Sequence, residues 1–330
     1  TVMKMLMRSG AVVYLPCTLA LNDVPRLQDG QINRISAAFA GLGGALYAHY
    51  QLQVSPPLFS VVVSITVIIM CYVGGIGSIY GAPSDCLWAG GRVEYSDRTP
   101  REVLALTREY GISARLTLSN SLLRPEHLTD PDCNALCRLF QEQNDPQNGA
   151  IVHAELLTQY LKKNYPSLYL VSSTTKVLTD FNDLQRELAR PEFRYVVPDF
   201  RLNRAFDRLA ALPQSQKDKV EFLCNECCWF GCTERRACYE AVSRKNLGLP
   251  GPEHYCSAPG AADGYRFSRA MANPGFIGIK AIRDTYLPRG FTQFKIEGRG
   301  LGSALILEFL LHYLTRPEYQ LAVREELYLD

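Results

Sequence analysis

Charged residues are missing from one long stretch of the chain. Residues Ile35 to Ser84 contain no Asp, Glu, Lys or Arg, although charged residues make up 21% of the 330 residues. An ionised group placed in hydrocarbon costs about 2 to 3 kcal/mol even on lenient scales, so this stretch suits a lipid-facing or deeply buried environment. The sequence therefore predicts two parts, residues 1–76 and residues 77–330, which we interpret separately.

Other features are absent as well. The net charge is +2 and no dense block of Lys or Arg occurs, so a nucleic-acid partner is unsupported. No secretory signal precedes the hydrophobic part, and Thr1 is not an initiator methionine, so we expect a fragment or a processed chain. Five of the eleven cysteines fall between Cys224 and Cys238, which does not suit a secreted disulfide framework. We expect a cytoplasmic protein, with membrane association through residues 35–80 left open.

Two hydrophobic segments occupy the stretch without charge. Leu58 to Tyr80 is long enough, at roughly 20 residues, for a helix to cross a bilayer. Ile35 to Tyr50 spaces Ala and Gly three or four residues apart, which is typical of helices that pack closely in lipid. Pro56 and Pro57 separate the two segments. Membrane helices and a buried hairpin of a soluble core both remain open, because the β-branched runs also suit strands.

Residues 34–82 also resemble a known family. The pairs His49-Tyr50 and Ser55-Pro56 and the run Gly74 to Ser78 are similar to the permease subunit of branched-chain amino-acid ABC transporters. The resemblance implies membrane-spanning helices and a heteromeric partner. A permease of that class needs more spanning helices than this segment offers, so the segment would be a transporter fragment that cannot transport alone.

From about residue 77 onward, short β-rich runs alternate with polar, helix-periodic stretches. This alternation is typical of parallel strands joined by crossover helices. The eight expected strands are Gly77–Tyr80, Ala114–Ser119, Ala150–Ala154, Leu168–Ser172, Arg194–Pro198, Val220–Asn225, Gly275–Ile279 and Thr292–Glu297. Thr99 as N-cap and Pro100 at the first helical position predict a helix over Thr99–Tyr110. Eight strands predict a (β/α)8 TIM-type barrel; an open Rossmann-like sheet is less favoured, because no strand precedes a G-x-G-x-x-G or Walker-type loop.

Polar residues recur at the carboxyl ends of the expected strands. Active sites of (β/α)8 barrels lie at that end, so these residues are candidates for a site, although any one of them alone is more commonly a cap or a surface ion pair. The expected catalytic residues are Glu226 and Glu297, which would handle protons, and Lys295 and Arg299, which would bind an anionic group of the substrate. The expected substrate-binding residues are Arg92, Asn120, Lys176, Asp199, Asn203 and Asn225.

The strongest chemical signal is the cysteine segment, residues 224–238. Thiolates close in sequence suit a zinc ion or an iron–sulfur cluster, each of which takes four such ligands, and the spacing does not decide between them. Cys224 alternates with Val220 and Phe222, so it is expected to point into the strand layer. The cysteines interpreted as free and buried are Cys17, Cys71, Cys133 and Cys137.

Four motifs of residues 77–330 resemble the collagenase-like peptidase family. They are Phe294–Arg299, the cysteine segment, Asp199–Asn203 and Trp88–Arg92. The resemblance implies a barrel and, in several members, a four-iron four-sulfur cluster on four cysteines. Here the implied ligands are Cys228, Cys232, Cys256 and Cys238, the last at a place where relatives often have His, with Cys86 or Cys227 as a replacement. Some members take part in oxygen-independent hydroxylation of ubiquinone precursors or RNA bases, and others are proteases.

We therefore expect a barrel enzyme with an iron–sulfur cluster near its rim, which carries out oxygen-independent hydroxylation or related redox chemistry on an unknown substrate. A protease of the same family is the alternative, although no Ser, His and Asp set and no H-E-x-x-H helix is recognisable and only five histidines are present. A zinc-stabilised protein without catalysis and a membrane transporter fragment of the ABC permease type are further alternatives.

Overall fold

The computed structural model describes residues 78–82, 86–90, 99–143, 145–297, 303–315 and 317–328. The hydrophobic, permease-like segment expected before residue 77 lies outside these residues, as do Arg92 and Arg299. No helix within the described ranges combines the length and the apolar character that a membrane crossing requires. The chain divides into two units, of which Gly77–Gly302 is one.

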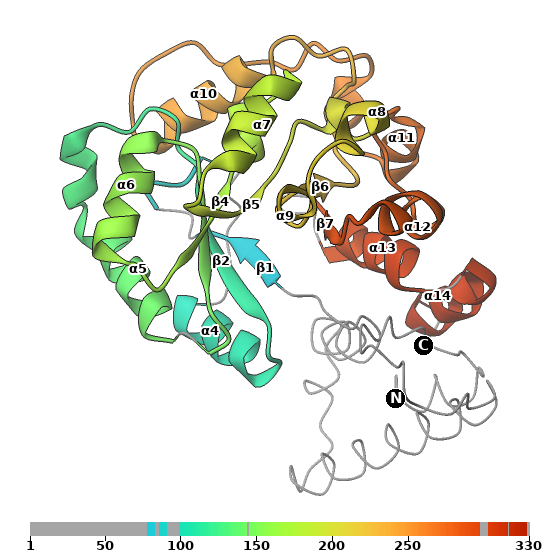
Figure 1. The fold of residues 1–330 in the computed structure, drawn as a ribbon, viewed down its shortest axis with the longest axis horizontal. Helices are drawn as coiled ribbons and strands as arrows, with labels where there is room; N and C mark the ends of the chain where they lie inside the picture. The colour runs from blue at the N-terminus through green and yellow to red at the C-terminus, as the bar shows by residue number, and fades with distance from the viewer. Residues whose placement is uncertain are drawn as a thin grey trace, which may run out of the picture. The chain divides into compact units, whose positions relative to one another are not determined.

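The described residues between 78 and 297 form an α/β structure around parallel strands (Figure 1). One sheet contains β1 (Ser78–Gly81), β2 (Ser113–Leu118), β3 (Gly149–Val152), β4 (Tyr169–Ser172) and β5 (Phe193–Val196), in that order. A second parallel pair consists of β6 (Glu221–Leu223) and β7 (Gln293–Lys295). A parallel bridge between Val196 and Val220 joins the two sheets where β5 ends and β6 begins.

Helices connect successive strands, as the alternating sequence pattern predicts. The longer ones are α4 (Pro100–Glu109), α5 (Pro131–Glu142), α6 (Glu155–Asn164), α7 (Phe181–Ala189) and α10 (Arg235–Asn246). The shorter ones are α8 (Phe206–Leu209), α9 (Gln214–Lys217), α11 (Phe267–Ala272) and α12 (Ile279–Ala281). Single turns are η2 (Pro125–Thr129), η3 (Thr174–Lys176), η4 (Phe200–Leu202), η5 (Ala261–Asp263), η6 (Ile282–Tyr286) and η7 (Leu287–Arg289). Helix α4 packs on β2 and α7 packs on β5.

The start of α4 confirms the helix predicted at Thr99. The Thr99 hydroxyl accepts a hydrogen bond from the Glu102 backbone N–H (3.3 Å), and the Glu102 carboxylate accepts one from the Thr99 N–H (2.7 Å). This reciprocal capping box satisfies two backbone donors that a helix start otherwise leaves unpaired. Leu104 on the same helix is buried, so the helix that begins at this cap also places an apolar side chain in the core.

Seven of the eight expected strands are present, as β1 to β7. The prediction of a strand at Gly275–Ile279 is wrong. Side-chain amides satisfy much of that segment's backbone: the Asn273 oxygen accepts from the Gly275 N–H (2.8 Å), and Asn203 Nδ2 donates to the Gly275 carbonyl (2.7 Å). The Ile277 N–H donates to the Cys224 carbonyl (2.9 Å), and α12 begins two residues later. The expected eight-stranded barrel is therefore not confirmed.

Side chains on distant strands nevertheless meet inside this unit. Arg115 on β2 donates to Glu221 on β6 (2.5 Å) and to the Tyr169 hydroxyl on β4 (2.8 Å). In a flat sheet, β2 and β6 would lie four strand spacings apart, about 19 Å. The strands must therefore curl around these buried groups.

Residues 303–315 and 317–328 belong to the other of the two units. It contains α13 (Ser303–Leu314), the turn η8 (Pro317–Tyr319) and α14 (Gln320–Tyr328). Arg324 of α14 forms an ion pair with Glu308 of α13 (2.7 Å), which fastens these two helices to each other.

Candidate functional site

A cavity of about 110 Å³ lies at the carboxyl ends of the strands. The ends of β1, β2, β6 and β7, the turn after β4 and the first helical turn of α10 all contribute to its wall. The residues expected from the sequence that line it are Glu226, Cys228, Cys238, Lys295 and Glu297. The alternation of the last strand thus brings Lys295 and Glu297 to one place, as expected for two positions on one strand face.

Two adjacent thiols and a carboxylate form the tightest cluster at the cavity. The potential ligand atoms of Glu226, Cys227 and Cys228 all lie within 4.8 Å of one another. The Cys227 thiol donates to the Glu297 carboxylate (3.0 Å), and the Cys228 N–H donates to Glu226 (3.1 Å). The hydrogen bond with Cys228, burial and the two nearby carboxylates raise the pKa of Cys227. Cys227 was expected only as a replacement for the fourth metal ligand, and its contact with Glu297 was not expected.

A buried arginine holds two carboxylates beside this cluster. Arg235, at the start of α10, is 1% exposed and pairs with Asp199 (2.6 Å) and with Glu226. Burial alone would raise the pKa of Glu226, but the Arg235 charge keeps it lowered. For Asp199, burial is likewise outweighed, by the hydrogen bond from Arg201 and the charge of Arg235, so its pKa is also lowered. Sequence inspection missed Arg235, because nothing local distinguishes it from the exposed Arg236 that follows it.

Lys295 and Glu297 face the cavity from β7 and the residues that follow it. The Lys295 side chain is buried, and its Nζ lies 4.0 Å from the centre of the Tyr80 ring. The Tyr80 hydroxyl donates to the Ile296 carbonyl (2.8 Å), which ties β1 to the end of β7. The Asn225 amide binds both backbone groups of Glu297, at 2.8 and 2.7 Å. Asn225 therefore fixes the position of Glu297 and does not itself line the cavity.

The other described candidates for substrate binding do not line the cavity themselves and make structural contacts. Asn120 donates to the carbonyls of Leu87 and Ser243, both at 3.2 Å. Asn203 donates to the Leu223 carbonyl (2.9 Å), and Lys176 forms an ion pair with Glu187 (2.5 Å). The candidates that do not line the cavity are Asn120, Lys176, Asp199, Asn203 and Asn225. The hydrogen bonds and ion pairs described for these residues give their polar side chains partners without a bound substrate.

The remaining cysteines are spread around the start of α10. The Cys232 carbonyl accepts from Arg201 (2.8 Å), and Cys256 is exposed on the loop after α10. Ser257, next to Cys256, donates to the Glu234 carboxylate (3.1 Å), so that loop returns to the cysteine segment. Among the described residues, no three of the four expected cysteine ligands have sulfur atoms that all lie within 4.8 Å of one another. The Cys86 thiol lies against Cys133 instead.

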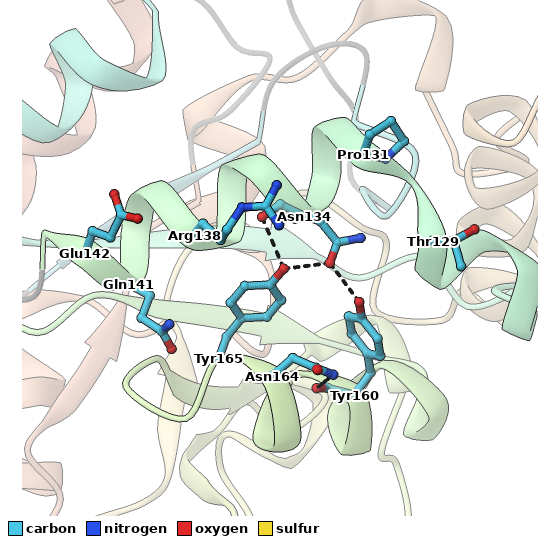
Figure 2. A pocket seen from close by; sticks show the side chains of 9 residues that line it. All are labelled: Thr129, Pro131, Asn134, Arg138, Gln141, Glu142, Tyr160, Asn164 and Tyr165. Carbon is cyan, nitrogen blue, oxygen red and sulfur yellow. Dashed lines mark hydrogen bonds between the residues drawn. The ribbon is translucent and has the colours of Figure 1, made fainter.

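A second, larger hollow lies on the helical layer. It measures about 670 Å³ and is lined by residues of α5, α6 and the segments beside them (Figure 2). The hydroxyls of Tyr160 (2.8 Å) and Tyr165 (2.6 Å) both donate to the Asn134 side-chain oxygen, as Figure 2 shows. These polar groups satisfy one another. The smaller cavity is the better candidate site, because thiols, carboxylates and a lysine converge on it.

Comparison with known proteins adds little to this picture. No family model and no curated protein matches the chain. Among solved structures, the chain is similar to the U32 peptidase Mk0906, with 15% sequence identity and a TM-score of 0.39, over 58% of this chain and 81% of that one. A likeness at this level carries no argument about family or activity.

Proposed function

We propose that the chain is a metal-dependent enzyme whose active site is the cavity of about 110 Å³ at the carboxyl ends of the parallel strands. The observation that carries this proposal is the set of reactive side chains on one small cavity: three thiols, two carboxylates and a lysine, namely Cys227, Cys228, Cys238, Glu226, Glu297 and Lys295. Clustered titratable groups with shifted pKa values in a cavity are typical of active sites.

The proposed architecture is a (β/α) barrel of the type found in the collagenase-like peptidase family. The ion pair between Arg115 and Glu221 supports it, because it links β2 to β6 through the interior. The hydrogen bond from Tyr80 to Ile296 supports it as well, because it links the first described strand to the end of the last one. Active sites of such barrels lie at the carboxyl ends of the strands, where this cavity is.

The proposed cofactor is a four-iron four-sulfur cluster held by Cys228, Cys232, Cys238 and Cys256. The donor chemistry fits: the first three lie on the cysteine segment and the start of α10, and the hydrogen bond from Ser257 to Glu234 brings the Cys256 loop back to them. A bound cluster would accept and pass on the electrons that leave the substrate in oxygen-independent hydroxylation, or transfer electrons in related redox chemistry. A zinc ion on the same thiols is the alternative cofactor.

The charged residues of the cavity have distinct proposed roles. Lys295 binds an anionic group of the substrate at the face of Tyr80. Glu297 accepts or returns a proton, and the Cys227 thiol, which donates to it, holds its carboxylate in place. Arg235 keeps Glu226 ionised and directs one of its oxygens to the Cys228 N–H. Arg235 is a positioning residue in this scheme, because it acts through Glu226.

Metal analysis of anaerobically purified protein tests the proposal. We expect about four iron and four sulfide ions per chain, with broad visible absorbance. Cys228→Ala and Cys256→Ala should lose both, whereas Cys137→Ala, a buried thiol on α5, is the matched control and should keep them. A colourless protein with about one zinc per chain would show that the cofactor is a zinc ion and not an iron–sulfur cluster. A protein without either metal that hydrolyses peptides would overturn the proposal in favour of a metal-independent peptidase.

A further inference from the structure

Two buried thiols outside the cavity lie in direct contact. The sulfurs of Cys86 and Cys133 are 3.5 Å apart, and the two residues are 7% and 2% exposed. Cys86 lies in the segment 86–90 after β1, and Cys133 lies in the first turn of α5, 47 positions later. The proposed cavity chemistry uses neither of them.

The backbones that carry these thiols are both held in place. The Cys133 N–H donates to Asp130, the N-cap of α5 (2.7 Å). On the other side, the Ala89 N–H donates to the Cys86 carbonyl (3.0 Å), and the Trp88 indole N–H donates to the His127 carbonyl (2.8 Å). The contact of the sulfurs therefore follows from packing of the segment 86–90 against η2 and α5.

We propose that Cys86 and Cys133 are an oxidisable pair that forms a reversible disulfide in the presence of a peroxide or a small-molecule disulfide. Sulfurs joined in a disulfide lie about 2.05 Å apart, so the two have to approach by roughly 1.5 Å. Rotation about the side-chain bonds is the movement that this step requires.

With hydrogen peroxide, the step balances as a two-electron oxidation. The Cys86 thiolate attacks one peroxide oxygen, the O–O bond breaks and hydroxide leaves, which gives a sulfenic acid. The Cys133 thiol then attacks that sulfur; the S–S bond forms, and the hydroxyl and the thiol proton leave as water. The step is written for attack by Cys86; attack by Cys133 gives the same disulfide, because the two sulfurs are in direct contact.

The disulfide would fasten a segment that also supports the cavity. Asn246 on α10 donates to the Ala89 carbonyl (2.6 Å), and the Asn120 N–H, after β2, donates to the Trp88 carbonyl (3.0 Å). Helix α10 also includes Cys238, which lines the cavity. Oxidation of the thiol pair would thus stiffen the support of α10 without a change in the cavity itself.

Peptide mapping of the full chain tests this inference. Reduced protein is treated with hydrogen peroxide or oxidised glutathione, blocked with iodoacetamide, digested with pepsin and analysed by mass spectrometry. We expect one pair of peptides joined through Cys86 and Cys133, which separates again after dithiothreitol. Cys137→Ala, one helical turn along α5, should keep this product, and Cys133→Ala should lose it.

The wild-type map decides the question even if Cys133→Ala does not fold. If other cysteines of the chain are oxidised while Cys86 and Cys133 are recovered as separate blocked peptides, the inference is wrong. A link from Cys86 to any other cysteine also overturns it. The oxidised wild type should in addition melt higher, by on the order of 5 °C, because the bond closes a long loop; an unchanged melting temperature would overturn the fastening role.

Discussion

Arg115 and Glu221 form a buried ion pair between β2 and β6, although three strands separate β2 from β6 in the order of the sheets. Their side chains are only 6% and 7% exposed. Burial alone would lower the pKa of Arg115, but Glu221 and the Tyr169 hydroxyl raise it above its usual range. The guanidinium also lies over the Tyr195 ring of β5, at 4.9 Å, so four strands contribute to this polar centre.

Removal of one partner of this pair should be far more costly than removal of both. Glu221→Met leaves a buried guanidinium without its carboxylate, and we expect a loss of about 3 to 5 kcal/mol in the free energy of unfolding. Arg115→Met combined with Glu221→Met should recover most of that loss. Urea denaturation of the single and double variants measures the coupling. The exposed pair Lys280 and Asp284 is the control, with an expected coupling below about 1 kcal/mol.

A coupling near zero for Arg115 and Glu221 would contradict the curled arrangement of the strands. In an open sheet the two side chains would not meet, and each substitution would act independently. The measurement thus tests the proposed barrel as well as the ion pair.

Much of the fold could be predicted because its determinants are local. The pair Thr99 and Pro100 marks a helix start wherever it occurs, and β-branched runs followed by turn residues mark strands. The strand expected at Gly275–Ile279 failed for a different reason. Its backbone groups are satisfied by Asn203 and Asn273, and the contact with Asn203 comes from a residue 72 positions away. No local pattern reports such a contact.

The candidate site was predictable only in part for the same reason. Glu226, Lys295 and Glu297 could be found because strand ends can be located from sequence. Arg235 could not be found, and Cys227 was expected only as a replacement metal ligand. The contacts of both come from residues elsewhere in the fold: two buried carboxylates for the arginine, and Glu297 for the thiol. Asn120, in contrast, lies at a strand end but donates hydrogen bonds to backbone carbonyls and does not line the cavity.

Gly90 should tolerate no side chain. A Cβ there would lie 2.1 Å from the Ser119 carbonyl oxygen and 2.5 Å from the Asn120 nitrogen, both backbone atoms that cannot move aside. We expect Gly90→Ala to lower the free energy of unfolding by about 3 kcal/mol or more. Gly81→Ala is the matched control, because no atom lies within 4 Å of its Cβ position. Equal stability of the two variants in urea would show that the segment 86–90 does not pack as described.

His153 should make the fold sensitive to mild acid. Burial, with the charges of Lys176 and Arg236, lowers its pKa from 6.5 to about 4. Below about pH 6.5 the unfolded chain takes up a proton at this histidine while the folded chain does not. The free energy of unfolding therefore has its full value above that pH and falls between about pH 6.5 and 4. The loss should be about 3 kcal/mol. His153→Asn, which keeps a polar group near the Thr175 hydroxyl, should show a smaller loss across this range in urea titrations. An identical loss in both proteins would count against the neutral, buried histidine.

Lys295 should be required for anion binding by the cavity. Its side chain is buried at the cavity wall beside Tyr80, so a bound anion there would gain from a positive charge in a poorly hydrated place. A ligand at ten times its dissociation constant stabilises the folded state by about 1.4 kcal/mol, enough to raise the melting temperature by about 3 to 6 °C. We therefore expect phosphate or acetate, compared with chloride at the same ionic strength, to raise the melting temperature of the wild type and not of Lys295→Met. Lys280→Met, a change of the same type at an exposed lysine on α12, should keep the shift. If Lys295→Met folds and still shows the full shift, the anion binds elsewhere and Lys295 has no part in substrate recognition.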